Sequence, residues 1–167
     1  MENRFENKEK YFAAANSFEG FKSNFDSIFS PLTHKKLFIL KGGPGTGKST
    51  LMRGIADRFG DVARVTRILC SSDTSSLDGV VLEKDEATVG IVDGTAPHVV
   101  EPKFPGAVEE IINLGDGFDY DALMNCSKEI IELSKKKSNA YKKAYVVLEN
   151  AGEIYRDIDR CFEKTYI

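Results

Sequence analysis

The sequence of 167 residues predicts an α/β fold in which a mainly parallel sheet is flanked by helices and followed by a long helical segment. In the first two thirds of the chain, short runs of β-branched and apolar residues, typical of buried strands, surround a stretch with helical periodicity. A glycine-rich loop joins the first of these runs to that helical stretch. From about residue 120 onward, apolar residues recur at intervals of three and four, which is typical of a long amphipathic helix.

The residues before the first strand are expected to be mainly helical. Residues 1–12 are charged and polar and predict a frayed or weakly helical start. A short helix is expected from Asn16 or Ser17, either of which suits a helix cap, to about Phe29. Its apolar positions form one face that we expect to dock onto the sheet, namely Phe18, Phe21, Phe25 and Ile28. Pro31 then ends the helix.

The next elements are predicted to be a strand, a loop and a helix. The strand is expected over 37–41, where Leu37-Phe38-Ile39-Leu40 is a short apolar run. The helix is expected over about 48–59, because its apolar residues have helical spacing, and Gly60 should end it as a C′ residue. The loop between them fits the phosphate-loop pattern G-x-x-x-x-G-K-[ST] with the residues Gly42-Gly43-Pro44-Gly45-Thr46-Gly47-Lys48-Ser49-Thr50.

This strand–loop–helix arrangement predicts a site for the triphosphate of a nucleotide. Glycine lets successive backbone N–H groups turn inward around phosphate oxygens, and the amino end of the helix directs its positive dipole at the same anion. Lys48 is expected to reach the β- and γ-phosphate oxygens, Ser49 to bind Mg²⁺, and Thr50 to contact the α-phosphate. The run 42–50 is therefore the predicted nucleotide-binding segment.

Three more strands are expected after this helix. In chain order, we expect a strand over 62–70, a polar loop over 71–76, a short strand over 79–83, a turn over 84–86 and a strand over 87–93. Residues 94–119 are rich in proline and glycine and predict a long irregular segment with one helical turn around 106–112. Loops of this length in a compact domain usually bind something or cover a site.

The last part of the chain, about 120–166, carries a heptad seam of apolar residues that Lys137 interrupts. We expect either one long helix or a helical hairpin that turns near Ser138-Asn139 or near 150–152. The segment either packs on the sheet or protrudes as a coiled coil that pairs with another subunit or another domain.

A carboxylate near the metal is the second requirement of phosphate-loop chemistry. Asp93 ends the apolar run Val89-Gly90-Ile91-Val92 and is the expected partner of Ser49 at Mg²⁺. Asp73 is the competing acid, because the polar loop that holds it could also face the phosphates. Lys48, Asp93 and Asp73 are therefore the candidate catalytic residues.

The residue after Asp93 is Gly94, where many vigorous ATPases carry a glutamate that polarises the attacking water. The base must then come from elsewhere, and the candidates are Asp73, Asp78, Glu101 and His98. His98 is either structural or catalytic, since it follows a strand whose end lies at the ligand-binding edge of an open α/β sheet. Arg64, Arg67 and Lys103 are further candidates for cations that contact the phosphates. Tyr11, Phe12 and Phe18 are candidates for aromatic residues that contact the nucleotide base.

Composition limits the classes of protein to which the chain can belong. Its length predicts a single domain over 1–167, with a core of about 32–119 and a helical segment of about 120–166. The net charge of −3 and the lack of a basic patch argue against nucleic acid as a partner. Scattered cysteines, a polar start without a secretory signal, and the lack of a membrane-length apolar run predict a cytoplasmic protein with no membrane partner.

Two runs of the sequence carry a resemblance to a known family. The first is the glycine-rich loop 42–50, and the second is Asp93-Gly94-Thr95-Ala96-Pro97-His98 with its continuation to Ala107. Together they resemble an uncharacterised family of bacterial P-loop ATPases found mostly in spore-forming Firmicutes. The resemblance extends from about residue 10 to about residue 160. Members of that family are usually built from two related P-loop halves in tandem, and this chain resembles the first half.

The predicted function is that of a Mg²⁺-dependent ATPase or an ATP-driven switch, with ATP and Mg²⁺ bound at the glycine-rich loop. The sequence contains no N-K-x-D motif for reading guanine, which favours adenine. Two alternatives stay open. One is a small-molecule or nucleotide kinase, because no glutamate follows Asp93 and the long segment 94–119 could fold over an acceptor. The other is a nucleotide-gated interaction module whose heptad helix binds a second copy or a second P-loop half.

Overall fold

The computed structural model describes residues 8–163 and residue 165, which belong to two compact units. One unit comprises Ser23–Phe118 and the described residues up to Ala14. The other comprises Ala15–Lys22 and the described residues from Asp119 onward. The predicted weak helix over 1–12 lies mostly outside the described residues.

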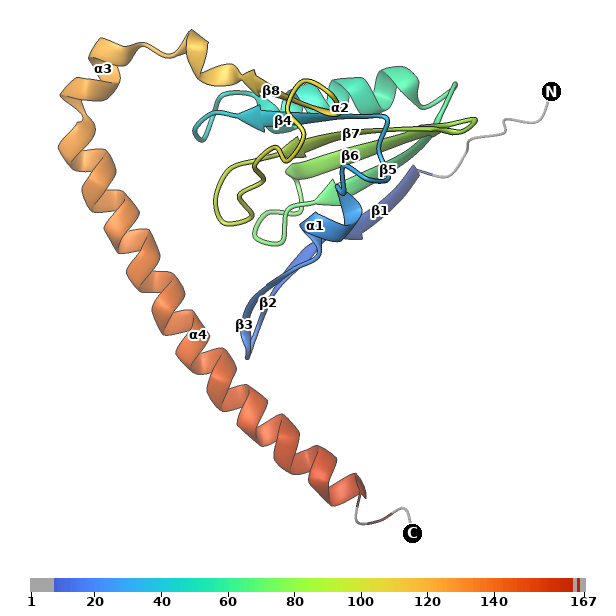
Figure 1. The fold of residues 1–167 in the computed structure, drawn as a ribbon. Coiled ribbons are helices and arrows are strands. Elements are labelled where there is room, and N and C mark those ends of the chain that lie inside the picture. The colour runs from blue at the N-terminus through green and yellow to red at the C-terminus, as the bar shows by residue number, and fades with distance from the viewer. Residues whose placement is uncertain (1–7, 164, 166–167) are drawn as a thin grey trace. The chain divides into compact units, whose positions relative to one another are not determined.

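The first unit contains a six-stranded sheet, shown in Figure 1. β6 runs antiparallel to both of its neighbours, and the other neighbouring strands pair in parallel. Across the sheet, the strands are β1 (Lys8–Phe12), β5 (Arg64–Leu69), β6 (Leu77–Lys84), β7 (Ala87–Asp93), β4 (Lys36–Lys41) and β8 (Glu109–Asn113). The predicted α/β class with a mostly parallel sheet is confirmed, as are the strands expected around 37–41, 62–70, 79–83 and 87–93.

The interior of the sheet is built around β4, which lies between β7 and β8. Leu37, Ile39 and Leu40 are fully buried, as expected for a strand covered on both faces. α2 (Lys48–Phe59) packs on one face through Met52 and Ala56, and it confirms the predicted helix. The same buried cluster includes Leu40, Val65, Leu77, Val80 and Ile91.

Gly60 follows α2 but does not cap it in the expected way. A C′ glycine normally has a positive φ, whereas Gly60 has φ −60° and lies in the right-handed region. The chain continues through a turn in which the N–H groups of Val62 and Ala63 both donate to the carbonyl of Phe59. These bonds cap the last turn of the helix without a left-handed residue.

The helical prediction for the start of the chain is wrong over the described residues. Residues 8–12 form β1, an edge strand that pairs in parallel with β5. Instead of a helix over about 17–29, the chain forms a hairpin of β2 (Ala14–Ser17) and β3 (Gly20–Ser23), followed by the short α1 (Phe25–Ile28). The reversal uses Gly20 at φ +96°, a conformation open to glycine. The helix-like spacing of the phenylalanines is therefore coincidental, and Phe25 is buried against Phe29.

The helical turn expected around 106–112 is also wrong. β8 occupies Glu109–Asn113 and pairs in parallel with β4, and the short 3₁₀ helix η1 (Leu114–Gly117) follows it. The buried carboxylate of Glu109 accepts hydrogen bonds from the backbone N–H groups of Lys103 and Phe104. Pairing with β4 and this internal anchor determine the strand, and neither is visible in the local sequence.

The second unit consists mainly of one long helix. α3 (Tyr120–Asn125) is followed by α4 (Ser127–Glu163), which continues without a turn at either of the predicted hairpin positions. The tip of the β2–β3 hairpin packs on α4: the hydroxyl of Tyr145 donates to Asn16, and the ring of Phe18 lies against Gly152. The prediction of a long helix is confirmed, whereas a coiled-coil partner stays a prediction.

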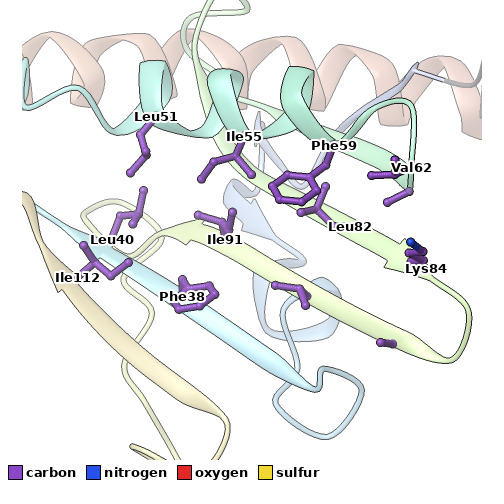
Figure 2. Close-up of a pocket in the computed structure, with 13 residues that line it drawn as sticks. Phe38, Leu40, Leu51, Ile55, Phe59, Val62, Leu82, Lys84, Ile91 and Ile112 are labelled. Carbon is purple, nitrogen blue, oxygen red and sulfur yellow. The ribbon is translucent and has the colours of Figure 1, made fainter.

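An apolar cleft lies between α2 and the sheet in the first unit (Figure 2). It has a volume of about 480 Å³ and is lined on the helix side by Leu51, Ile55 and Phe59, with Phe38 and Ile112 on the sheet side. Its lining is almost entirely hydrocarbon, and Lys84 is its one charged residue, so it does not resemble a phosphate or metal site. None of the helices within the described part of the chain has both the length and the apolar character needed to cross a membrane.

The buried position of Leu37 generates a stability prediction. We expect Leu37→Ala to destabilise the sheet by about 2–5 kcal/mol, because it leaves a cavity beside Gly90 in the central strand. Leu32→Ala is the matched control, since Leu32 is 82% exposed. Amide hydrogen exchange of β4 and β7 measures the opening free energy of this unit separately from the long helix. Equal protection in the two variants would contradict the proposed core.

Candidate functional site

The glycine-rich loop lies at the edge of the sheet where β4 ends, which is the edge at which open α/β sheets bind ligands. Gly45 and Gly47 have φ values of +81° and +86°, and Gly47 is the residue before α2. A side chain at either position would be strained in this conformation. The loop therefore depends on glycine for its backbone path from β4 into the helix.

Lys48 is the first residue of α2, and its ammonium group folds back over the loop. Nζ donates to the carbonyl oxygens of Gly42 at 2.6 Å and Gly43 at 3.0 Å. It also lies 3.7 Å from Oδ2 of Asp93, and both side chains are largely buried. A buried ammonium group thus connects the loop to the end of the neighbouring strand β7.

Asp93 is oriented by the residue two positions later. Its Oδ1 accepts hydrogen bonds from the backbone N–H of Thr95 at 2.9 Å and from the Thr95 hydroxyl at 2.6 Å. This local turn leaves Oδ2 directed to Lys48. Sequence reasoning missed Thr95, although an aspartate followed two residues later by threonine is a recognisable turn signal.

Ser49 connects the start of α2 to the start of β6. Its Oγ accepts a hydrogen bond from the backbone N–H of Leu77 at 2.9 Å. The oxygen keeps a second lone pair, and its own proton can be donated elsewhere. The predicted metal-binding hydroxyl therefore stands at the same edge of the sheet as Lys48 and Asp93.

Asp78 and His98 form an ion pair beside these residues. Gly79 of β6 and Val92 of β7 are register partners, so Asp78 and Asp93 stand opposite each other one step further along. The register of β5 against β6 shifts at Asp78, and such a bulge re-aims a side chain. Oδ2 of Asp78 lies 3.1 Å from Nε2 of His98, and both are buried. The imidazole stacks on Phe25 with ring centroids 4.1 Å apart.

The charges around His98 favour its protonated form. Burial alone lowers the pKa of the imidazole, but the hydrogen bond to Asp78 and the charges of Asp78 and Asp93 act more strongly in the opposite sense. The net result is a pKa of His98 above its ordinary value. On the other side of Asp78, burial raises the pKa of the Cys70 thiol and keeps it neutral. Asp78 and Asp93 therefore both favour the protonated form of the same imidazole.

The packing around Gly94 explains why no glutamate follows Asp93. A Cβ at this position would overlap the side chain of Ile39 and would lie 3.1 Å from the carbonyl oxygen of Val100. Nζ of Lys41 adds to the crowding, because it donates to the Gly94 and Val100 carbonyls and to Glu101. Glu101, a candidate base from the sequence, is thus engaged by Lys41.

The other predicted site residues are exposed or paired elsewhere. The Asp73 carboxylate is exposed and accepts hydrogen bonds from the N–H and hydroxyl of Ser75, which lower its pKa. Arg64 starts β5 at the opposite edge of the sheet, where it pairs with Glu9. Lys103 is exposed. Tyr11 and Phe12 are exposed on β1, which β5, β6 and β7 separate from β4.

Phe118 is an aromatic residue at the loop that the sequence did not indicate. A Cβ on Gly43 would lie 3.1 Å from its ring, so the ring packs directly on the glycine-rich loop. It reaches this position because β8 and η1 return the chain to the end of β4. Only the pairing of β8 with β4 brings residue 118 to residue 43.

The described residues contain no ready-made cluster of three or more acidic, histidine or cysteine ligands for a metal ion. Mg²⁺ does not require one, because it is usually held by one or two carboxylates together with substrate phosphates and waters. Asp93 and the Ser49 hydroxyl are oxygen donors at the loop, and their chemistry suits Mg²⁺. The residues present therefore fit a magnesium ion that arrives with a polyphosphate.

Comparisons with known proteins add no relative to this description. No protein-family model matches the chain, and no significant match was found among curated proteins or solved structures. The functional conclusion depends on the site itself.

The elevated pKa of His98 can be measured by NMR titration of its imidazole. We expect a pKa above about 6.5 in the wild type and a lower value in Asp78→Asn, which removes the nearest negative charge. Since the folded pKa exceeds the unfolded one, the stabilisation is complete below about pH 6.5 and is lost as pH rises through the folded value. The stability difference between wild type and Asp78→Asn should therefore shrink at alkaline pH. An unchanged or larger difference there would contradict this assignment.

Proposed function

We propose that this protein binds ATP with Mg²⁺ at the glycine-rich loop 42–50 and hydrolyses it, or uses it as a switch. The observation that carries the proposal is the position of Lys48. Its buried ammonium group lies against two loop carbonyls and 3.7 Å from an aspartate at the end of the adjacent strand. A lysine in this setting can exchange loop carbonyls for phosphate oxygens without leaving its place.

Phosphate binding is supported by the way the loop enters α2. The first N–H groups of a helix lack partners within the helix and carry its positive dipole, so they attract an anion. The helix begins at Lys48 after a left-handed Gly47, and no acidic residue lies in its first turn. Pro44, Gly45, Gly47 and Thr50 are exposed and accessible to a ligand.

Magnesium binding is assigned to Ser49 and Asp93. When bound, Mg²⁺ would neutralise part of the charge on the phosphates. Asp93 is held for this role by Thr95, and Ser49 is held by the backbone of Leu77. Both donors are therefore positioned by the fold before any ligand arrives.

The proton-handling role is assigned to the Asp78–His98 pair. A glutamate directly after Asp93 is excluded by the packing around Gly94, so the base must stand elsewhere at this edge. Asp78 faces Asp93 across adjacent strands, and its carboxylate accepts from His98. The Asp78 carboxylate can orient a water molecule and accept its proton near the metal side of the site, with His98 as its hydrogen-bond partner.

The order of the strands agrees with this reading. The strand before the glycine-rich loop and the strand ending in Asp93 are direct neighbours, as a P-loop fold of this kind requires for lysine and aspartate to meet. We therefore propose a P-loop-type fold for the sheet, and we retain the sequence resemblance to bacterial P-loop ATPases as part of the proposal.

Replacing the lysine tests nucleotide binding directly. Lys48→Ala should weaken Mg²⁺–ATP binding by at least about tenfold, because it removes a charged donor from the phosphate site. Isothermal titration calorimetry measures the affinity, and Lys35→Ala, at an exposed lysine just before β4, is the matched control. Equal affinity in the two variants would exclude the loop as the nucleotide site.

Replacing the acid separates binding from turnover. Asp93→Asn should retain most of the ATP affinity but lower Mg²⁺-dependent phosphate release by at least about a hundredfold, since electrostatic groups of this kind act mainly on the transition state. Asp73→Asn is the comparison and should leave turnover unchanged, because Asp73 is exposed and has local partners. The reverse pattern would transfer the metal role to Asp73. Binding without turnover in the wild type would favour the nucleotide-gated module.

A further inference from the structure

A second cavity of about 360 Å³ lies on the face of α2 that is turned toward β5 and the loop before β6. Its polar lining comes from four parts of the first unit and comprises Lys10, Arg53, Asp57, Arg67, Thr74 and Ser75. Leu69 and Leu77 form its apolar part. The volume falls in the range of small-molecule sites.

Arg67 is the unusual residue of this cavity. It is 6% exposed and projects from β5 to α2, where Nη2 donates to Oδ1 of Asp57 at 2.7 Å. Its other terminal nitrogen, Nη1, is buried and has no hydrogen-bond partner among the described residues. An unmatched charged donor inside a protein is costly, so a missing acceptor is expected near it.

The side chains of the cavity carry more positive than negative charge, which also favours a negatively charged ligand. Asp57 compensates Arg67, and the exposed Asp73 carboxylate interacts with Arg53, but Lys10 of β1 adds a further positive charge. Arg53 is held in place because Nη2 donates to the carbonyl of Ser75. The chain as a whole has a net charge of −3, so this local excess of cations is not a general property of the surface. An anion would relieve it.

We propose that this cavity, defined by Lys10, Arg53 and Arg67, binds a small molecule through an oxyanion group, either phosphate or carboxylate. Arginine presents its donors in a planar fork that matches both groups. The oxyanion would lie beside the Arg67 guanidinium, and Arg53 and Lys10 would share its charge. The hydroxyls of Thr74 and Ser75 line the same space and can donate to a polar ligand.

The cavity is separate from the nucleotide site but is connected to it through α2. Arg53 and Asp57 follow Ser49 by four and eight residues, which places all three on one face of the helix. Leu77 lines the cavity, and its backbone N–H donates to Ser49. Binding at the cavity does not rest on the proposed ATPase function, because none of its lining residues belongs to the glycine-rich loop.

The test uses the full chain carrying Lys48→Ala, so that anion binding at the glycine-rich loop is reduced. Inorganic phosphate and malonate are titrated separately in about 0.15 M chloride, at which weak surface attraction is screened, and backbone NMR shifts are followed. We expect saturable shifts at β5, the middle of α2 and residues 71–76 with at least one probe. The probe that binds distinguishes a phosphate-bearing from a carboxylate-bearing ligand.

Substitutions then locate the site. Arg53→Gln and Lys10→Gln should each weaken the binding by about tenfold, because each removes a charged donor. Arg58→Gln, at an exposed arginine on the same helix outside the cavity, should leave it unchanged. Both substitutions avoid the buried Arg67 and should preserve folding. The proposal is overturned if neither anion gives saturable shifts, or if all three variants bind alike. Loss of ATP binding in Lys48→Ala with anion binding retained would separate the two sites.

Discussion

The contact between Lys48 and Asp93 depends on one feature of the sheet, the direct pairing of β4 with β7. Leu40 and Asp93 are register partners, so the strand that ends in the acid finishes beside the strand that leads into the glycine-rich loop. A buried ammonium group and a buried carboxylate are each costly alone, and together they compensate each other. The other contacts at this edge of the sheet build on that pairing. Thr95 orients the Asp93 carboxylate, and the carbonyls of the loop accept the remaining hydrogen bonds of the Lys48 ammonium group.

Asp78, Asp93 and His98, which lie beside this contact, also compensate one another's charges. Asp78 and Asp93 stand on neighbouring antiparallel strands, where two carboxylates would repel each other. His98 lies next to them, stacks on Phe25 and pairs with Asp78, and the two carboxylates raise the pKa of its imidazole. Lys41 organises the segment that brings His98 back to the sheet, and Gly94 leaves room for this segment to pass close to β4. The same segment thus leaves no room for a side chain at residue 94 and brings His98 to the sheet.

Helix α2 connects the chemistry at its amino end to the rest of the unit. Its buried face supports the central strands through Met52 and Ala56. A second face carries Ser49, Arg53 and Asp57 toward β5 and β6, where the proposed anion cavity lies. The helix therefore faces two polar sites and one apolar core at once.

The sequence by itself determined β4, the glycine-rich loop and α2, because a run of apolar residues, a set of glycines and a helical period are local signals. It also indicated Lys48, Ser49 and Asp93, since each sits at a fixed distance from such a signal. It could not determine β1, the β2–β3 hairpin or β8, whose state is set by partners distant in the chain. Lys8–Phe12 is polar and becomes a strand because β5 offers an open edge. Glu109–Asn113 becomes one because β4 does. The pairing of Asp78 with His98 and the contact of Asp93 with Lys48 likewise arise only when the strands assemble, because strand order determines which charges meet.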